Sequence, residues 1–137
     1  MGNFLIKMKK ERVKILIVDD EKIIQEVMTR LLRKKGFITE TAENGRDALE
    51  KIVQDKPDII ILDILMPEMD GLQVYKRLRE NPDTQHIPII FLSAEESIKH
   101  AILDKTRTIT EYIEKPCDIE YLVKRIKSLT TGKNYLT

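Results

Sequence analysis

Five short apolar segments alternate along the chain with segments whose apolar residues recur at helical spacing. The apolar segments, predicted as strands, are 13–18, 37–42, 58–63, 88–93 and a short one around 112–113. The predicted helices are 23–32, 45–55, 71–80, a weaker one over 97–105, and a last one over 119–129 that Asp118 caps. Because this alternation is typical of right-handed βαβ units, the sequence predicts an α/β fold, a doubly wound parallel sheet of five strands with five helices.

Length and composition narrow the class of protein. A chain of 137 residues is long enough for one domain with a core of its own. The net charge of +1 gives no general attraction to nucleic acid or anionic lipid, so we expect no direct nucleic-acid binding. The apolar runs are too short for membrane insertion. The single cysteine, Cys117, excludes an internal disulfide and fits the reducing cytoplasm. We expect a flexible leader over 1–12, one domain over 13–130 and a tail over 131–137.

Polar side chains follow four of the five predicted strands at the point where each strand ends. Asp19 and Asp20 follow the first strand, Asp63 the third, Ser93 ends the fourth and Lys115 follows the fifth. In open parallel sheets, ligands bind outside the carboxyl ends of the strands. One acid at a strand end is usually only a helix cap. Clustered carboxylates, however, raise each other's pKa values and cost stability unless a cation is present.

The kind of cation follows from the available ligand atoms. The cluster offers oxygen only, with no histidine or cysteine near it in sequence, which favours Mg²⁺ or a similar hard ion over zinc. Mg²⁺ usually takes one or two carboxylates, so one acid remains for chemistry. An aspartate can attack phosphorus and form an aspartyl phosphate, while a cation and a lysine neutralise the transferred group.

The same residues carry a resemblance to a known family. The pair Asp19-Asp20, then Asp63 with MPEMDG soon after it, Ser93-Ala94 and Lys115-Pro116 together resemble the receiver domain of two-component response regulators. The resemblance covers about residues 13 to 130. It implies a flavodoxin-like sheet with strand order 2-1-3-4-5, and a signalling domain rather than a metabolic enzyme, one that catalyses only its own phosphotransfer and autodephosphorylation.

The resemblance implies a role for each acid. Asp63 is expected to accept a phosphoryl group from a phosphohistidine on a sensor histidine kinase or a histidine phosphotransfer protein. Asp20 and Asp63 are expected to bind Mg²⁺ directly, together with the main-chain carbonyl of Leu65. Asp19 is expected to act through water.

Three further residues acquire roles in the same way. Lys115 is expected to pair with the acceptor carboxylate and then with the phosphoryl group, and the bond from Lys115 to Pro116 is expected to be cis. Ser93 is expected to be the switch hydroxyl and Tyr112 the switch aromatic, whose ring is expected to turn from exposed to buried on phosphorylation. The surface expected to change on phosphorylation is the fourth helix, the fifth strand and the fifth helix.

Three other functions compete with this interpretation. A phosphohydrolase similar to haloacid dehalogenases needs a second aspartate two residues after the nucleophile, where this chain has Leu65. A flavodoxin-like FMN binder needs hydroxyls and amides after the first strand, where Asp19, Asp20 and Glu21 would repel phosphate. A degenerate receiver used as a scaffold would not need the complete acidic set. Whether the chain is a stand-alone regulator or a piece of a longer one is left open.

Overall fold

The strands and helices alternate as the sequence predicts. The computed structural model describes residues 12–94 and 110–130. Within these ranges the elements are β1 (Lys14–Val18), α2 (Lys22–Lys34), β2 (Ile38–Ala42), α3 (Gly45–Gln54), β3 (Ile59–Leu62), α4 (Gly71–Glu80), β4 (Ile89–Ser93), β5 (Thr110–Glu114) and α6 (Ile119–Leu129). Five predicted strands and four predicted helices are confirmed. The predicted helix over 97–105, the tail over 131–137 and all of the leader but Arg12 lie outside the described residues.

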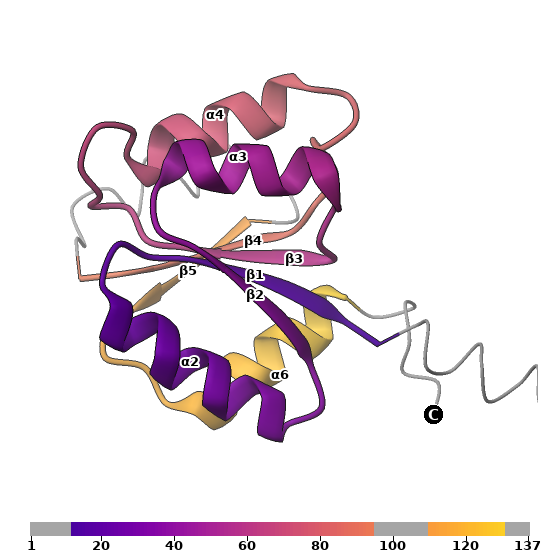
Figure 1. The fold of residues 1–137 in the computed structure, drawn as a ribbon. Helices are drawn as coiled ribbons and strands as arrows, with labels where there is room; N and C mark the ends of the chain where they lie inside the picture. The colour runs from indigo at the N-terminus through magenta and orange to yellow at the C-terminus, as the bar shows by residue number, and fades with distance from the viewer. Residues whose placement is uncertain (1–11, 95–109, 131–137) are drawn as a thin grey trace, which may run out of the picture.

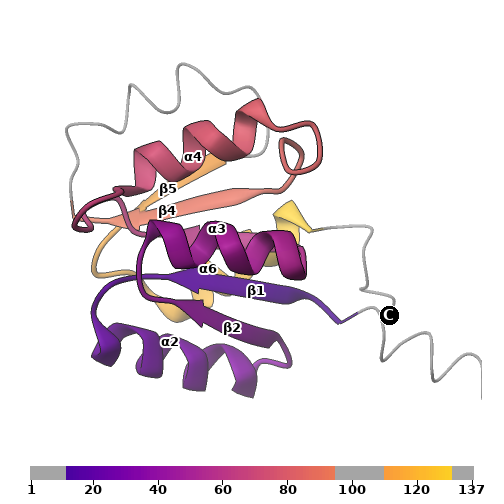
Figure 2. The ribbon, with the colours of Figure 1, turned by 45° about the horizontal axis from the view of Figure 1, so that its top comes forward.

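All five strands are parallel and form one sheet in the order β2-β1-β3-β4-β5, as the family resemblance implies. Helices α3 and α4 cover one face of the sheet, and α2 and α6 cover the other (Figure 1). The same layers are visible after rotation (Figure 2). None of the helices in the described ranges is both long and apolar enough to cross a membrane.

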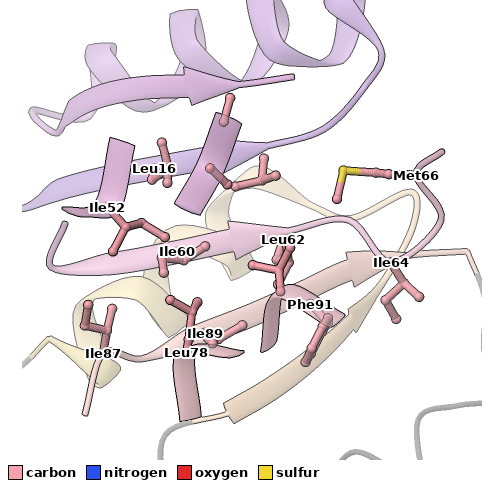
Figure 3. Close-up of a cluster of buried hydrophobic side chains, with 14 residues drawn as sticks. Leu16, Ile52, Ile60, Leu62, Ile64, Met66, Leu78, Ile87, Ile89 and Phe91 are labelled. Atoms are coloured by element: carbon pink, nitrogen blue, oxygen red, sulfur yellow. The ribbon is translucent and has the colours of Figure 1, made fainter. Parts of the chain in front are cut away.

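The core consists of two apolar layers, one on each face of the sheet. Alternate strand residues point to opposite faces, so Leu62 lies in the layer under α3 and α4, whereas Ile61 lies in the layer against α2 and α6. Figure 3 shows the first layer, in which strand side chains meet Ile52 of α3 and Leu78 of α4. All four residues of β3 are buried because both faces of this central strand are covered.

The helices begin in two different ways. Asn44, Asp70 and Asp118 each precede a helix, and their side chains accept a hydrogen bond from a main-chain N–H of its first turn. At the start of α2, Glu21 makes no such side-chain hydrogen bond. The loop from β1 into α2, which contains Asp19 and Asp20, therefore lacks the usual side-chain cap.

Candidate functional site

Two aspartates are placed at the carboxyl edge of the sheet by main-chain hydrogen bonds. The N–H of Asp63 donates to the carbonyl of Val18 over 3.0 Å, and the N–H of Asp19 donates to the carbonyl of Ala42 over 3.1 Å. Each aspartate thus continues the ladder of the strand before it. Asp19 and Asp63 are both buried, at 3% and 7% exposure. The sheet therefore determines where both carboxylates lie.

Three carboxylates meet at this edge. One oxygen from each of Asp19, Asp20 and Asp63 lies within 4.8 Å of the other two. Asp20 is exposed, so the cluster opens to solvent on its side. The structure therefore brings together the three acids that the sequence indicates, in a group accessible to a small ligand.

Asp19 is held at each of its polar atoms. Its Oδ1 accepts a hydrogen bond from the N–H of Glu21 over 2.9 Å, and its Oδ2 accepts one from Lys115 Nζ over 3.1 Å. Its main-chain carbonyl accepts one from the side-chain amide of Gln25 over 2.6 Å. With its N–H bonded to Ala42, Asp19 is a fixed part of the site.

Lys115 reaches the acids from the end of β5. Its N–H donates to the carbonyl of Ser93 over 3.0 Å, and its bond to Pro116 is cis, as the resemblance implies. Its Nζ lies 3.1 Å from Asp19 Oδ2 and 3.8 Å from Asp63 Oδ1. The closer partner is thus Asp19, whereas the resemblance emphasises Asp63. Burial lowers the pKa of Lys115, but the hydrogen bond to Asp19 and the charge of Asp63 outweigh it and raise the pKa overall.

The surroundings of Asp63 disfavour its charge. The pKa of Asp63 is raised to about 6 overall, and burial is the largest cause. The charge of Lys115 acts in the opposite direction, while those of Asp19 and Asp20 raise the pKa further. A hydrogen bond from the main chain of Ile64 lowers it slightly. Asp63 is therefore mainly ionised at neutral pH, but at a cost in free energy.

The donor set fits a hard divalent cation. It offers carboxylate oxygens within 4.8 Å of one another, and like charges already raise the pKa of one of them. Such oxygens suit Mg²⁺ better than a metal that prefers nitrogen or sulfur. The side chain of Leu65 is 58% exposed, and the role of its carbonyl as a ligand stays a prediction.

The two predicted switch residues contact each other, and one of them also contacts the main chain of Lys115. Ser93, at the end of β4, is buried, and the hydroxyl of Tyr112 in β5 donates to its main-chain carbonyl over 3.2 Å. Tyr112 is half-buried and packs against the core layer under α3 and α4, whereas an exposed ring was expected before phosphorylation. The carbonyl of Ser93 therefore accepts two hydrogen bonds, one from the Tyr112 hydroxyl and one from the N–H of Lys115.

Residues outside the predicted set also shape the site. A Cβ atom at Gly71 would lie 2.2 Å from the carbonyl oxygen of Asp63, so only glycine allows the loop after β3 to fold back this closely. The N–H of Gly71 donates to the carbonyl of Ile64 over 2.9 Å. In the sequence, Gly71 marks only the start of the predicted helix over 71–80, and no motif points to Gln25. The one signal for Gln25 is its place, one helical turn after Glu21.

Comparisons with known proteins agree with this geometry. The family model for the response regulator receiver domain matches residues 15–127. The response regulator MprA of Mycolicibacterium vanbaalenii is 37% identical over 117 residues, which are 85% of this chain and 50% of MprA. The chain spans about half the length of the curated relatives that it matches.

Solved structures show the same fold. The signal receiver domain of a signal transduction histidine kinase from Syntrophus aciditrophicus is 33% identical, with a TM-score of 0.79, over 91% of this chain and 95% of that one. The response regulator TrrA from Thermotoga maritima, solved in complex with Mg(2+)-BeF, is 33% identical, with a TM-score of 0.76, over 85% of this chain and 98% of TrrA.

Proposed function

The chain belongs to the response regulator receiver domain family of two-component systems, and we propose that it accepts a phosphoryl group on Asp63 from a phosphohistidine of a partner protein. The partner would be a sensor histidine kinase or a histidine phosphotransfer protein. One observation carries the proposal. Asp63 is a buried carboxylate at the end of the central strand, close to two other acids and to the ammonium group of Lys115.

The chemistry needs an ionised nucleophile and a neutralised phosphoryl group. A carboxylate oxygen of Asp63 attacks phosphorus, the P–O bond forms as the P–N bond of the phosphohistidine breaks, and the imidazole nitrogen keeps the electron pair. With a pKa of about 6, Asp63 is mainly in the nucleophilic form at neutral pH. Lys115 Nζ, 3.8 Å from Asp63 Oδ1, would neutralise oxygens of the arriving group.

Asp20 and Asp63 would hold Mg²⁺ directly with the carbonyl of Leu65, and Asp19 would act through water. The bound ion supplies positive charge opposite the phosphoryl oxygens. The oxygen-only donor set supports this assignment. So does the state of Asp19, whose two carboxylate oxygens are already bonded to Glu21 and Lys115 and are therefore less available to a metal.

The domain would pass on the signal by a conformational change of the surface near Ser93. A phosphoryl oxygen on Asp63 would attract the Ser93 hydroxyl. Tyr112, which is hydrogen-bonded to the Ser93 carbonyl, would then move further inward. Such a shift requires that the contact with Ser93 differ between the two states. The affected face would include β5, α6 and the predicted helix over 97–105, which lies outside the described residues.

Phosphorylation with a small phosphodonor tests this function. The protein is incubated with acetyl phosphate and Mg²⁺, and its intact mass is measured. The wild type should gain one phosphoryl group and Asp63→Asn none. Asp70→Asn is the matched control, because asparagine also caps a helix, and it should be labelled like the wild type. Full labelling of Asp63→Asn would show that the acceptor lies elsewhere.

A further inference from the structure

The loop that contains Asp19 and Asp20 is hydrogen-bonded to a side chain of α2, the helix that follows it. Helices α3, α4 and α6 are each capped by the side chain of the residue before them, whereas Glu21, before α2, makes no capping hydrogen bond. The side chain of Gln25, one turn into α2, instead donates to the carbonyl of Asp19 over 2.6 Å. We infer that Gln25 is a positioning residue for the proposed magnesium site, on which this inference rests.

The hydrogen bond of Gln25 orients the peptide that leads into Asp20. The carbonyl of Asp19 belongs to the planar peptide unit between Asp19 and Asp20, so holding its oxygen limits the rotation of that unit. The main-chain N–H of Gln25 also donates to the carbonyl of Glu21 over 3.1 Å. Gln25 therefore contacts the turn at both of its ends, on the two sides of Asp20.

Asp20 depends on this support more than its neighbours do. Asp19 and Asp63 are buried, but Asp20 is exposed. In the part of the chain that the structure describes, the carboxylate of Asp20 has no hydrogen bond that would fix its direction. The orientation of its main chain therefore limits the region that its oxygens can reach.

Magnesium is sensitive to such positioning and calcium much less so. Mg²⁺ requires near-ideal octahedral geometry, whereas Ca²⁺ accepts flexible geometry with six to eight ligands. If Gln25 positions Asp20, its loss should weaken Mg²⁺ binding more than Ca²⁺ binding. If Gln25 only stabilised the helix, its loss would lower the melting temperature and leave both affinities unchanged.

Two substitutions remove the contact in different ways. Gln25→Met keeps the length of the side chain without its amide, and Gln25→Asn keeps the amide on a side chain one methylene shorter, which cannot span the same distance. Gln54→Met is the matched control, because Gln54 is exposed at the last turn of α3. Asp20→Ala removes a direct ligand. All variants are titrated with MgCl₂ and, separately, CaCl₂, and the amide NMR signal of Glu21 is followed.

We expect both Gln25 variants to bind Mg²⁺ about tenfold more weakly than the wild type, the size of effect typical of a residue that orients a metal ligand. Their Ca²⁺ affinity should fall by a smaller factor, and Gln54→Met should bind both ions normally. Should Gln25→Met fail to fold, Gln25→Asn provides the same comparison. Wild-type Mg²⁺ affinity in the Gln25 variants, or equal losses for the two ions, would overturn the inference. A wild type that binds no Mg²⁺ would instead refute the metal site proposed above, and this inference with it.

Discussion

Asp63 is an acid whose surroundings favour its neutral form. Its pKa is raised to about 6, mainly by burial, while the charge of Lys115 lowers it and the charges of Asp19 and Asp20 raise it. The same placement gives Asp63 its proposed role, because a buried carboxylate is poorly solvated and lies in a cluster whose member Asp20 is exposed. The buried position of Asp63 at the end of β3 therefore both supports its proposed reactivity and makes its charge costly for the stability of the fold.

The raised pKa predicts how stability depends on pH. A carboxylate with a folded pKa of about 6 and an unfolded value of 3.8 stabilises the fold fully below pH 4, and this contribution is lost as the pH rises through 6. In metal-free protein at pH 7.5, Asp63→Asn should therefore raise the free energy of unfolding. We expect about 1–2 kcal/mol, less than the full change in pKa implies, because solvent screens part of the effect.

Urea denaturation in EDTA at pH 4 and pH 7.5 measures this difference. The gain from Asp63→Asn should be present at pH 7.5 and nearly absent at pH 4. Glu50→Gln, at an exposed position of α3, is the control and should have little effect at either pH. A gain of the same size at both pH values would mean that the burial of a charge is not its cause.

At the scale of elements, the loop from β3 to α4 keeps Asp63 in place. The loop ends in a capping box, in which Asp70 accepts a hydrogen bond from the N–H of Gln73 and its own N–H donates to the Gln73 side chain. Gly71 then lies directly against the carbonyl of Asp63. The start of α4 is therefore packed against the main chain of Asp63, the proposed acceptor.

We predict that Gly71→Ala damages the fold and the site together. The added Cβ would lie 2.2 Å from the Asp63 carbonyl oxygen and 2.9 Å from the Ile64 Cα, both main-chain atoms that cannot move without moving β3. The free energy of unfolding should fall by about 1–3 kcal/mol. The rate of labelling by acetyl phosphate should fall as well, since Asp63 is displaced.

Gly36→Ala separates the two effects. Gly36 has a φ of +96° with no atom within 4 Å of an added Cβ, so alanine there brings backbone strain without a clash. It should lower stability by about 1–2 kcal/mol and leave the labelling rate of the folded protein unchanged. If Gly71→Ala behaved in the same way, the close approach at Asp63 would not matter for function.

At the scale of the whole molecule, the acids are supported by a core that fills both faces of the sheet. Residues of β1, β3 and β4 alternate between the two apolar layers, and the carboxyl ends of β1, β3 and β5 lead directly to the site. A ligand at this edge contacts segments far apart in the sequence. Its binding should therefore stabilise the domain as a unit.

We predict that Mg²⁺ raises the melting temperature, because unfolding separates the three aspartates. At a free concentration one hundred times its dissociation constant, a ligand that binds only the folded state adds about 2.7 kcal/mol. Thermal unfolding with increasing MgCl₂ measures the effect. Asp20→Ala should remove most of the rise in melting temperature that MgCl₂ causes. Without metal, this variant should be at least as stable as the wild type, because one repelling charge is gone. An unchanged response in Asp20→Ala would argue against the assigned site.

The sequence predicts the order of the elements and the four described helices. It also predicts which polar residues lie at the carboxyl edge of the sheet, namely Asp19, Asp20, Asp63, Ser93 and Lys115. Hydrophobic periodicity is a local property, and parallel strands joined by right-handed crossovers place all their carboxyl ends on the same side. Strand order and the cis bond at Pro116 needed the family resemblance as well. These features depend on pattern and topology and not on the positions of single atoms.

Only the tertiary structure decided the contacts within the site. Whether Lys115 lies nearer Asp19 or Asp63 depends on a difference of less than an ångström between side chains from different strands. The pKa of Asp63 depends on burial by segments distant in sequence, and the roles of Gln25 and Gly71 depend on close main-chain approaches. No local pattern encodes these distances, because they result from the packing of the whole chain around one sheet edge.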